Sequence, residues 1–100
     1  MLGNMMNGQL LISGLIEYAE TYFSSQEIVS RTVEGSIHRY TFLDAAKRSR
    51  QLANALDRLG LKHGDTVGTL AWNTFRHFEL YFGVSGIGCV VNTVNPRLFP

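Results

Sequence analysis

Residues 66–94 read TVGTLAWNTFRHFELYFGVSGIGCVVNTV, and their pattern predicts the topology of the chain. Its first seven residues form a nearly unbroken apolar run, which predicts a strand covered on both faces. Asn73 or Thr74 can cap a helix that follows, and this helix carries one aromatic stripe: Phe75, Phe78 and Phe82. A second apolar run, CVVNTV at residues 89–94, predicts another strand. The short connections predict a βαβ unit whose two strands lie parallel in one sheet.

The residues before this unit predict a helix and then a hairpin. Between Leu10 and Phe23, apolar residues recur at intervals of three and four and give one side of an amphipathic helix: Leu11, Leu15, Tyr18 and Tyr22. Such a helix needs a groove to lie in. Residues 27–42, EIVSRTVEGSIHRYTF, are rich in β-branched residues on both sides of a break at Glu34-Gly35-Ser36. They predict a β-hairpin.

A central helix is expected after the hairpin. Thr41 stands three residues before Asp44, which is the spacing of a capping box, and Gly60 can supply the left-handed residue that ends the helix. One face continues at helical spacing through Ala45, Ser49, Leu52, Leu56 and Leu59. The predicted fold class is therefore α/β, with an N-terminal helix, a β-hairpin, and then a βαβ unit of a partial sheet.

Composition and charge narrow the classes of function. The 100 residues permit one small domain, and the 45% hydrophobic content predicts a packed core. The net charge of +1 gives no reason to expect a nucleic-acid or acidic-membrane partner. Glu17 and Glu20 interrupt the N-terminal apolar stretch, so neither a signal peptide nor a transmembrane helix is expected. The single cysteine, Cys89, is expected to be a buried thiol, which suits a reducing compartment.

The histidines, serines and glycines of the chain do not match the sequence pattern of a metal site, a nucleophile or a phosphate-binding loop. No metal-ligand spacing relates the three histidines, so His38, His63 and His77 are expected to be ordinary residues at the surface or at the edge of the core. Ser85, in GVSGIG, lacks the glycine spacing of a nucleophile elbow. The glycines at 83, 86 and 88 follow a helix and precede a strand, so close packing of helix on strand is favoured over a phosphate loop.

Two further clusters have a structural and a functional interpretation. The central helix carries four basic residues, and Asp44 and Asp57 among them favour a solvated face with local ion pairs over a basic patch: Lys47, Arg48, Arg50 and Arg58. Four aromatic residues of the next helix are expected in the core rather than around an apolar ligand: Phe75, Phe78, Tyr81 and Phe82.

A series of short motifs occurs in a fixed order through the second half of the chain. They are Leu52-Ala53 with Ala55-Leu56, Leu59-Gly60, Gly64-Asp65, Asn73, Arg76-His77 with Glu79, Tyr81-Phe82, Asn92-Thr93 and Asn95-Pro96-Arg97-Leu98. Together with the hairpin before them, they resemble the N-terminal portion of the AMP-forming acyl-CoA synthetases, in particular the fatty-acid CoA ligases of the adenylate-forming superfamily. The resemblance extends from about Leu10 to Pro100.

This resemblance implies a parent enzyme that joins a fatty acid to ATP as an acyl-adenylate and then transfers the acyl group to CoA, with magnesium. The family's phosphate donors come from a Ser/Thr/Gly-rich loop ending in lysine and from later motifs, none of which occurs in residues 1–100. The resemblance thus implies that residues 1–100 are the N-terminal part of a large AMP-binding domain, incomplete and without its catalytic portion. No catalytic, cofactor-binding or metal-binding residue is expected in this chain, and the chain alone is expected to be inactive.

The matching residues at the strand ends are expected to serve folding. Asn73, Asn95 and Pro96 stand where a cap or turn is needed, and Arg97 is a candidate partner for a carboxylate elsewhere in a complete enzyme. The edge of the strand at residues 89–94 is expected to be unpaired and prone to association.

Two alternatives remain open from the sequence. The first is a non-catalytic interaction module that dimerises with itself or with a full-length synthetase through the Leu10 to Phe23 helix. The second is an unrelated small nucleotide-binding protein, which is disfavoured because the turn after TVGTLAW has no glycine. The expected location is cytoplasmic, with peripheral membrane association as a further expectation.

Overall fold

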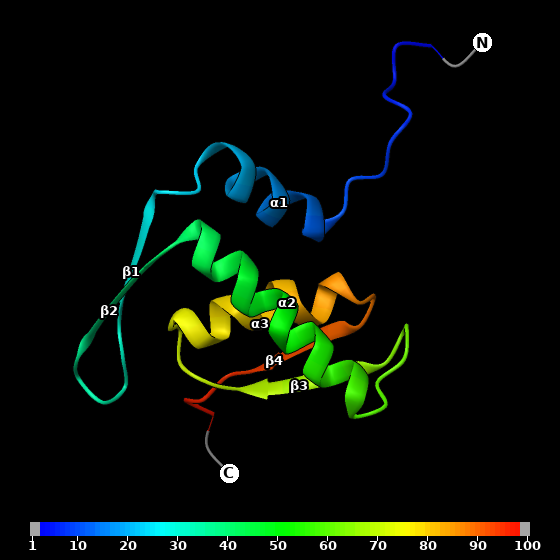
Figure 1. Ribbon diagram of the computed structural model, residues 1–100. Helices are drawn as coiled ribbons and strands as arrows, with labels where there is room; N and C mark the ends of the chain where they lie inside the picture. Colours follow the sequence, from blue (N-terminus) through cyan, green and yellow to red (C-terminus); the bar gives the residue numbers. More distant parts are fainter. Residues whose placement is uncertain (1–2, 99–100) are drawn as a thin grey trace.

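The structure is a computed structural model, and it describes residues 3–98. Within these residues, three helices and four strands follow one another (Figure 1). They are α1 (Ile12–Tyr22), β1 (Glu27–Arg31), β2 (Ile37–Thr41), α2 (Phe42–Arg58), β3 (Thr66–Leu70), α3 (Phe75–Gly86) and β4 (Val90–Val94). This order confirms the predicted α/β class.

The strands form two separate two-stranded sheets. Strands β1 and β2 pair antiparallel with Glu27 opposite Thr41, which confirms the hairpin. Strands β3 and β4 pair parallel, with Thr66 opposite Val90 and Leu70 opposite Val94. Helix α3 connects these two parallel strands, so the βαβ unit is confirmed as well.

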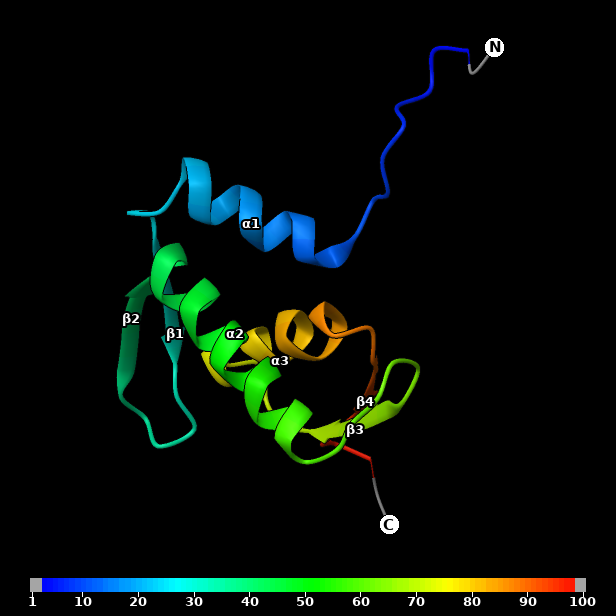
Figure 2. The same cartoon turned by 45° about the vertical axis from the view of Figure 1, so that its right-hand side comes forward.

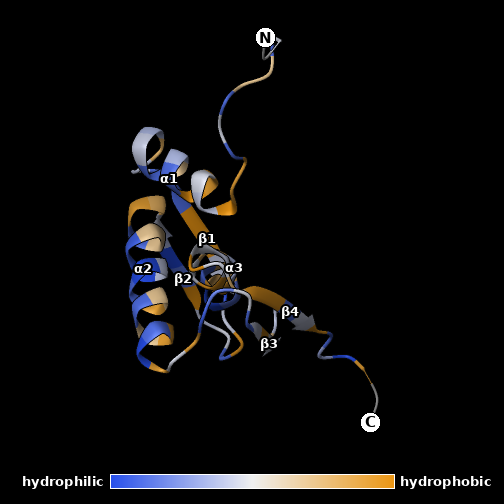
Figure 3. Cartoon of the chain, turned by 90° about the vertical axis from the view of Figure 1, so that its right-hand side faces the viewer, coloured by the Kyte–Doolittle hydropathy of each residue, from blue (hydrophilic) through white to orange (hydrophobic). Residues whose placement is uncertain are grey.

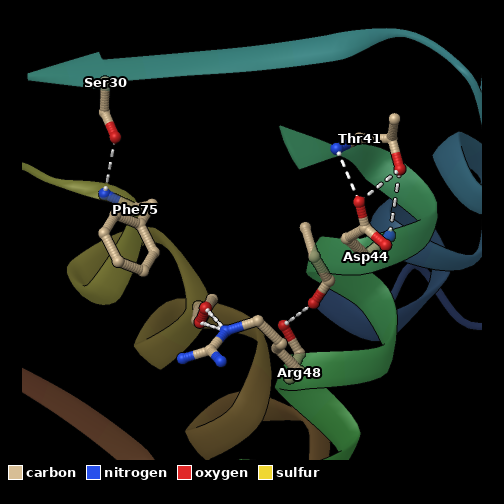
Figure 4. A network of polar contacts seen from close by, with 8 residues as sticks. Ser30, Thr41, Asp44, Arg48 and Phe75 are labelled. Carbon is tan, nitrogen blue, oxygen red and sulfur yellow. Dashed lines mark hydrogen bonds and ion pairs between the residues drawn. The ribbon is translucent and has the colours of Figure 1, made fainter. Parts of the chain in front are cut away.

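Helix α2 begins and ends as its sequence predicts. The Thr41 hydroxyl accepts a hydrogen bond from the Asp44 N–H at 3.2 Å, and the Asp44 carboxylate accepts one from the Thr41 N–H at 3.1 Å (Figure 4). This hydrogen bond from the Thr41 backbone lowers the pKa of the Asp44 carboxyl. Gly60 follows the helix at a φ of +92°, a conformation that glycine adopts without strain.

The core lies where the three helices meet the hairpin. Helices α1, α2 and α3 each contact the other two, and the hairpin lies at one end of α2 and α3 (Figure 2). The buried apolar residues of this cluster are Ile16, Tyr40, Ala45, Ala46 and Phe75, and Ile28, Phe42, Phe78 and Phe82 pack against them. Alanines in the middle of the cluster leave room for the flanking helices to approach α2 closely. The prediction that the aromatic residues of α3 belong to the core is thus confirmed for Phe75, Phe78 and Phe82 and wrong for Tyr81, which is 40% exposed.

The predicted contact face of α1 is wrong. Leu11, Leu15, Tyr18 and Tyr22 are all more than half exposed, and Ile16 is the residue of α1 that is buried. Helix α1 packs on both α2 and α3, and its Ile16 joins Ala45 and Ala46 of α2 in the buried cluster. The helix is also shorter than predicted, since it begins at Ile12 and ends at Tyr22. Leu59, predicted on the buried face of α2, is 80% exposed because it follows the last helical turn.

The prediction that the strand at residues 66–72 is covered on both faces is also wrong. Thr69 faces α3 and is buried, whereas Leu70 on the opposite face is 70% exposed. Figure 3 shows the hydrophobic colour of β4 at the margin of the molecule. Within residues 3–98, α3 is the helix that packs on this sheet, and a single helix covers only one face.

Glycines in α3 and just after it allow close packing, and Gly83 lets α2 and α3 approach each other. A Cβ atom added at Gly83 would lie 2.7 Å from a methyl carbon of Leu52 and 3.1 Å from the Ser49 carbonyl oxygen, both on α2. A Cβ added at Gly88 would collide with the His63 ring, whereas one at Gly86 would meet nothing within 4 Å. The predicted packing of helix on strand is therefore wrong in its partners: Gly83 packs helix on helix, and Gly88 packs on a loop.

We expect Gly83→Ala to reduce the free energy of unfolding by about 1–3 kcal/mol, because the added methyl forces α2 and α3 apart. Gly86→Ala is the matched control in the same helix and should leave stability unchanged or raise it slightly. Urea denaturation followed by far-ultraviolet circular dichroism measures both. Equal midpoints for the two variants would contradict the close packing described for Gly83.

Candidate functional site

A hollow of about 490 Å³ opens at the carboxyl ends of β3 and β4. Its lining comes from the ends of both strands, the turns that follow them and the first turns of α3, and includes Trp72, Asn73, His77, Tyr81, Asn95 and Arg97. In open α/β sheets, ligands bind in the crevice outside the carboxyl ends of the strands. By its position, this hollow is the candidate site of the chain.

His77 is held at the floor of the hollow by β3. Its Nε2 atom lies 3.1 Å from the Thr69 hydroxyl, and its ring centroid lies 4.9 Å from that of Tyr81. The His77 Nδ1 atom is buried without a hydrogen-bond partner. His77 is therefore a buried residue rather than the surface or core-edge histidine that the sequence predicts.

Thr69 and His77 pair a hydroxyl with an imidazole, as a nucleophile and its general base do, but neither side chain is accessible to a substrate. Thr69 is 5% exposed and His77 is 4% exposed, so the hydroxyl oxygen does not face the hollow as an accessible group. A nucleophile must reach its substrate within hydrogen-bond distance. The pair instead fastens α3 to β3, which is a structural role.

The turn after β4 forms the opposite wall of the hollow. The Asn95 side-chain oxygen accepts a hydrogen bond from the Arg97 N–H at 2.9 Å, so Asn95 is a turn residue as predicted. The guanidinium carbon of Arg97 lies 5.6 Å from the centroid of Trp72, which is within the range of a cation–π contact. The expected carboxylate partner of Arg97 stays a prediction.

An ion pair between the half-exposed Arg48 and the buried carboxylate of Glu79 joins α2 to α3 beside the core. The Nε–H of Arg48 donates to both carboxylate oxygens of Glu79, at 2.5 and 3.0 Å, and Glu79 is only 4% exposed. Burial, with the Glu79 charge adding to it, raises the pKa of the Tyr40 hydroxyl well above its ordinary value. Arg50 similarly pairs with Glu20 of α1. The predicted local ion pairs of the α2 face are therefore wrong for Arg48 and Arg50, whose partners belong to other helices.

The N-terminus of α3 is capped by the hairpin. Thr74 occupies the capping position but makes no capping hydrogen bond with its side chain. The Phe75 N–H instead donates to the Ser30 hydroxyl of β1 at 3.2 Å (Figure 4). The ring of His38 stacks on that of Phe75 with centroids 3.6 Å apart. Sequence reasoning missed Ser30, because no local spacing relates two residues that are 45 positions apart.

The remaining candidates lie apart from one another. His38 is in the hairpin, and His63 is in the loop that packs against Gly88. Ser85 is half-buried near the end of α3. Cys89 is buried, as predicted, with its sulfur 3.3 Å from the Lys62 carbonyl oxygen. Within residues 3–98, no group of three or more histidine, cysteine, aspartate or glutamate side chains lies close enough to hold a metal ion.

No helix among the described residues is long and apolar enough to cross a membrane. The geometry defines an α/β segment with a hollow at the carboxyl ends of the parallel strands β3 and β4.

Comparison with known proteins assigns the family. The model of the AMP-binding enzymes matches residues 18–100, which is most of the chain. The chain is 48% identical over 100 residues to the 3-methylmercaptopropionyl-CoA ligase of Ruegeria lacuscaerulensis and 46% identical over 99 residues to the medium-chain-fatty-acid–CoA ligase of Ectopseudomonas oleovorans. These matches cover 100% and 99% of the chain, but only 19% and 18% of the relatives.

Solved structures agree with this assignment. A Rhodopseudomonas palustris protein assigned to the long-chain-fatty-acid CoA ligases superposes with a TM-score of 0.75 at 29% identity, over 90% of this chain and 22% of that one. The fatty acyl CoA synthetase of Mycobacterium tuberculosis shares the fold at 23% identity, with a TM-score of 0.72 over 88% of this chain and 17% of that one. The chain belongs to the AMP-binding enzyme family. It spans about a fifth of the length of the curated relatives it matches.

The contribution of the ion pair between Arg48 and Glu79 to stability can be tested by substitution. We expect Arg48→Ala to reduce the free energy of unfolding by about 2–4 kcal/mol, because it leaves the Glu79 carboxylate buried without its cation. Arg50→Ala is the matched control on the same helix, and about 0–1 kcal/mol is expected there because its ion pair is more exposed. Thermal or urea unfolding measures both, and a loss at Arg50 as large as that at Arg48 would contradict the assignment.

Proposed function

We propose that residues 1–100 are the N-terminal part of the large domain of a fatty-acid CoA ligase. The parent enzyme joins a fatty acid to ATP as an acyl-adenylate, with release of pyrophosphate, and then transfers the acyl group to CoA. The observation that carries this proposal is the sequence identity of 44–48% to three acyl-CoA ligases, which extends over 96% or more of the chain. The domain is incomplete in residues 1–100, and its catalytic portion lies outside them.

The chemistry explains why this segment alone does not catalyse. A carboxylate is a poor electrophile, so its activation requires groups that stabilise the negative charge developing on the phosphates. In the parent, magnesium and donors from later segments serve this purpose. Residues 1–100 contain two lysines, Lys47 and Lys62, and no Ser/Thr/Gly-rich loop ending in lysine. The contribution of this segment is therefore a packed scaffold, and it supplies no catalytic, cofactor-binding or metal-binding residue.

The relatives that match this chain are named for different acid substrates. The Ruegeria protein is named for a 3-methylmercaptopropionyl group, and the Ectopseudomonas and Thermus thermophilus proteins for medium-chain and long-chain fatty acids. All three match this chain at similar identity. Identity to this segment therefore does not distinguish between these acids, and we expect acyl chain length to be selected outside residues 1–100. The substrate class that we assign to the parent is an aliphatic carboxylic acid together with ATP and CoA, in the cytoplasm.

A chimera tests this function. The chain should replace the matching segment of the Ectopseudomonas ligase, and the product should form acyl-CoA with dependence on ATP and CoA. The chimera should also keep the acyl preference of its host, because this segment does not select the acyl chain. The isolated 100-residue chain is the control, and isothermal titration should detect no micromolar binding of ATP or AMP. A folded but inactive chimera, or micromolar nucleotide binding by the isolated chain, would contradict the proposal.

The exposed side of α1 favours a second candidate function. Leu11, Leu15, Tyr18 and Tyr22 form an apolar stripe that faces solvent, and the rings of Tyr18 and Tyr22 lie 4.8 Å apart. Such a stripe is typical of a surface that meets a partner. The parent would then form a homodimer through its N-terminal segment, or the stripe would rest peripherally on a membrane.

We expect Leu15→Lys to weaken dimerisation of the active chimera, because the charge falls in the middle of the apolar stripe. Thr21→Lys, on the same helix but outside the stripe, is the control. Sedimentation velocity measures the fraction of dimer. A dimer unaffected by Leu15→Lys would rule out this surface as the dimer contact.

A further inference from the structure

The hairpin presents one face to the start of α3. Ser30 of β1 lies opposite His38 of β2 in the antiparallel register, so the two side chains project from the same face of the hairpin. The Ser30 hydroxyl accepts a hydrogen bond from the Phe75 N–H at 3.2 Å (Figure 4). The His38 ring stacks on the Phe75 ring, with centroids 3.6 Å apart. Because Phe75 is the first residue of α3, the hairpin holds this helix at its N-terminus.

The hydrogen bond to Ser30 takes the place of a local cap. The first N–H groups of a helix have no partner within the helix, and the side chain at the capping position usually accepts from one of them. Thr74 occupies that position but makes no such hydrogen bond. The Phe75 N–H belongs to the planar peptide group that joins Thr74 to Phe75. Ser30 therefore restrains the last peptide of the turn at residues 71–74, which connects β3 to α3.

This turn lies between the hairpin and the candidate site. Trp72 and Asn73 line the hollow at the carboxyl ends of β3 and β4. On the hairpin side, Asn73 and Thr74 line a smaller hollow of about 290 Å³ together with Ile28 and Ser30. A hollow on each side deprives the turn of part of its packing contacts. Its position therefore depends on the contacts at its ends.

The two ends of the turn are held in different ways. The contact of 3.1 Å between the Thr69 hydroxyl and His77 Nε2 ties β3 to the first turn of α3. This contact fixes the distance that the turn must span. The four residues between Leu70 and Phe75 keep several allowed backbone paths over that distance. The restraint from the hairpin selects one of these paths, because it fixes the orientation of the final peptide.

We propose that Ser30 is a positioning residue of the candidate site: through the peptide between Thr74 and Phe75, it sets the place of Trp72 and Asn73 in the wall of the hollow. Coupling between two sites is reciprocal, so a ligand that shifts the turn would also weaken the docking of the hairpin. This coupling goes beyond the proposed function and does not rest on it, because its test measures the turn itself rather than acyl-CoA formation.

Trp72 is the single tryptophan of the chain, so its fluorescence reports on this turn. In Ser30→Ala, the Phe75 amide should exchange roughly three- to tenfold faster, which is the factor for one lost hydrogen bond. Acrylamide quenching of Trp72, which is 47% exposed, should rise by up to about twofold as the turn loosens. Ser30→Thr keeps the hydroxyl and should return both values to those of the native chain.

A matched control on the same hairpin separates this restraint from a general loosening. The Ser36 hydroxyl lies 2.9 Å from the Thr32 hydroxyl within the hairpin turn, and Ser36→Ala should leave both values unchanged. Far-ultraviolet circular dichroism checks that each variant is folded. A folded Ser30→Ala with native values would overturn the proposal. So would a Ser30→Thr that restores neither value, or a Ser36→Ala with changes as large as those of Ser30→Ala.

The native chain provides a second measurement if Ser30→Ala does not fold. At urea concentrations below the unfolding transition, exchange of the Phe75 amide and quenching of Trp72 should rise in parallel, because one opening releases both. Rises with different dependence on urea would overturn the coupling. A failed chimera would count against the proposed function without affecting these measurements.

Discussion

Helices α2 and α3 approach each other closely because Gly83 presents no side chain to Leu52 and to the Ser49 carbonyl oxygen. Once the helices are this close, the carboxylate of Glu79 is shut away from solvent, and the Arg48 guanidinium is the cation that reaches it. A buried carboxylate without a partner is strongly unfavourable, so the contact and the ion pair require each other. The same approach brings Phe75 onto the core beside Tyr40 and Ala45.

The rest of the segment is attached to α3. Its N-terminus receives the Ser30 hydroxyl from the hairpin, and its first turns hold β3 through His77 and Thr69. The two sheets share no strand pairing, so α3 is the element that relates them. The hollow at the carboxyl ends of β3 and β4 follows from this arrangement, because its floor belongs to α3 and its walls to the two strand ends.

Sequence reasoning succeeded where the deciding contacts are local. The capping box of Thr41 and Asp44, the turn at Asn95 and the left-handed Gly60 all depend on residues within a few positions of one another. Sequence reasoning failed where the burial of a residue depends on which other element packs against it. The stripe of α1 has the spacing of a buried face, but α2 meets the helix at Ile16 instead. The apolar run of β3 is typical of a strand whose sheet is covered on both faces. Among residues 3–98, α3 packs on one face of this sheet.

Periodicity, caps and ordered motifs are properties of the chain, so the α/β class, the order of helices and strands, the parallel pairing and the family could all be predicted from the sequence. The contacts of Arg48 with Glu79 and of Ser30 with the N-terminus of α3 could not, and they are seen only in the folded structure. They join residues 31 and 45 positions apart. Packing brings such distant residues together, and no local spacing in the sequence shows which surfaces will meet.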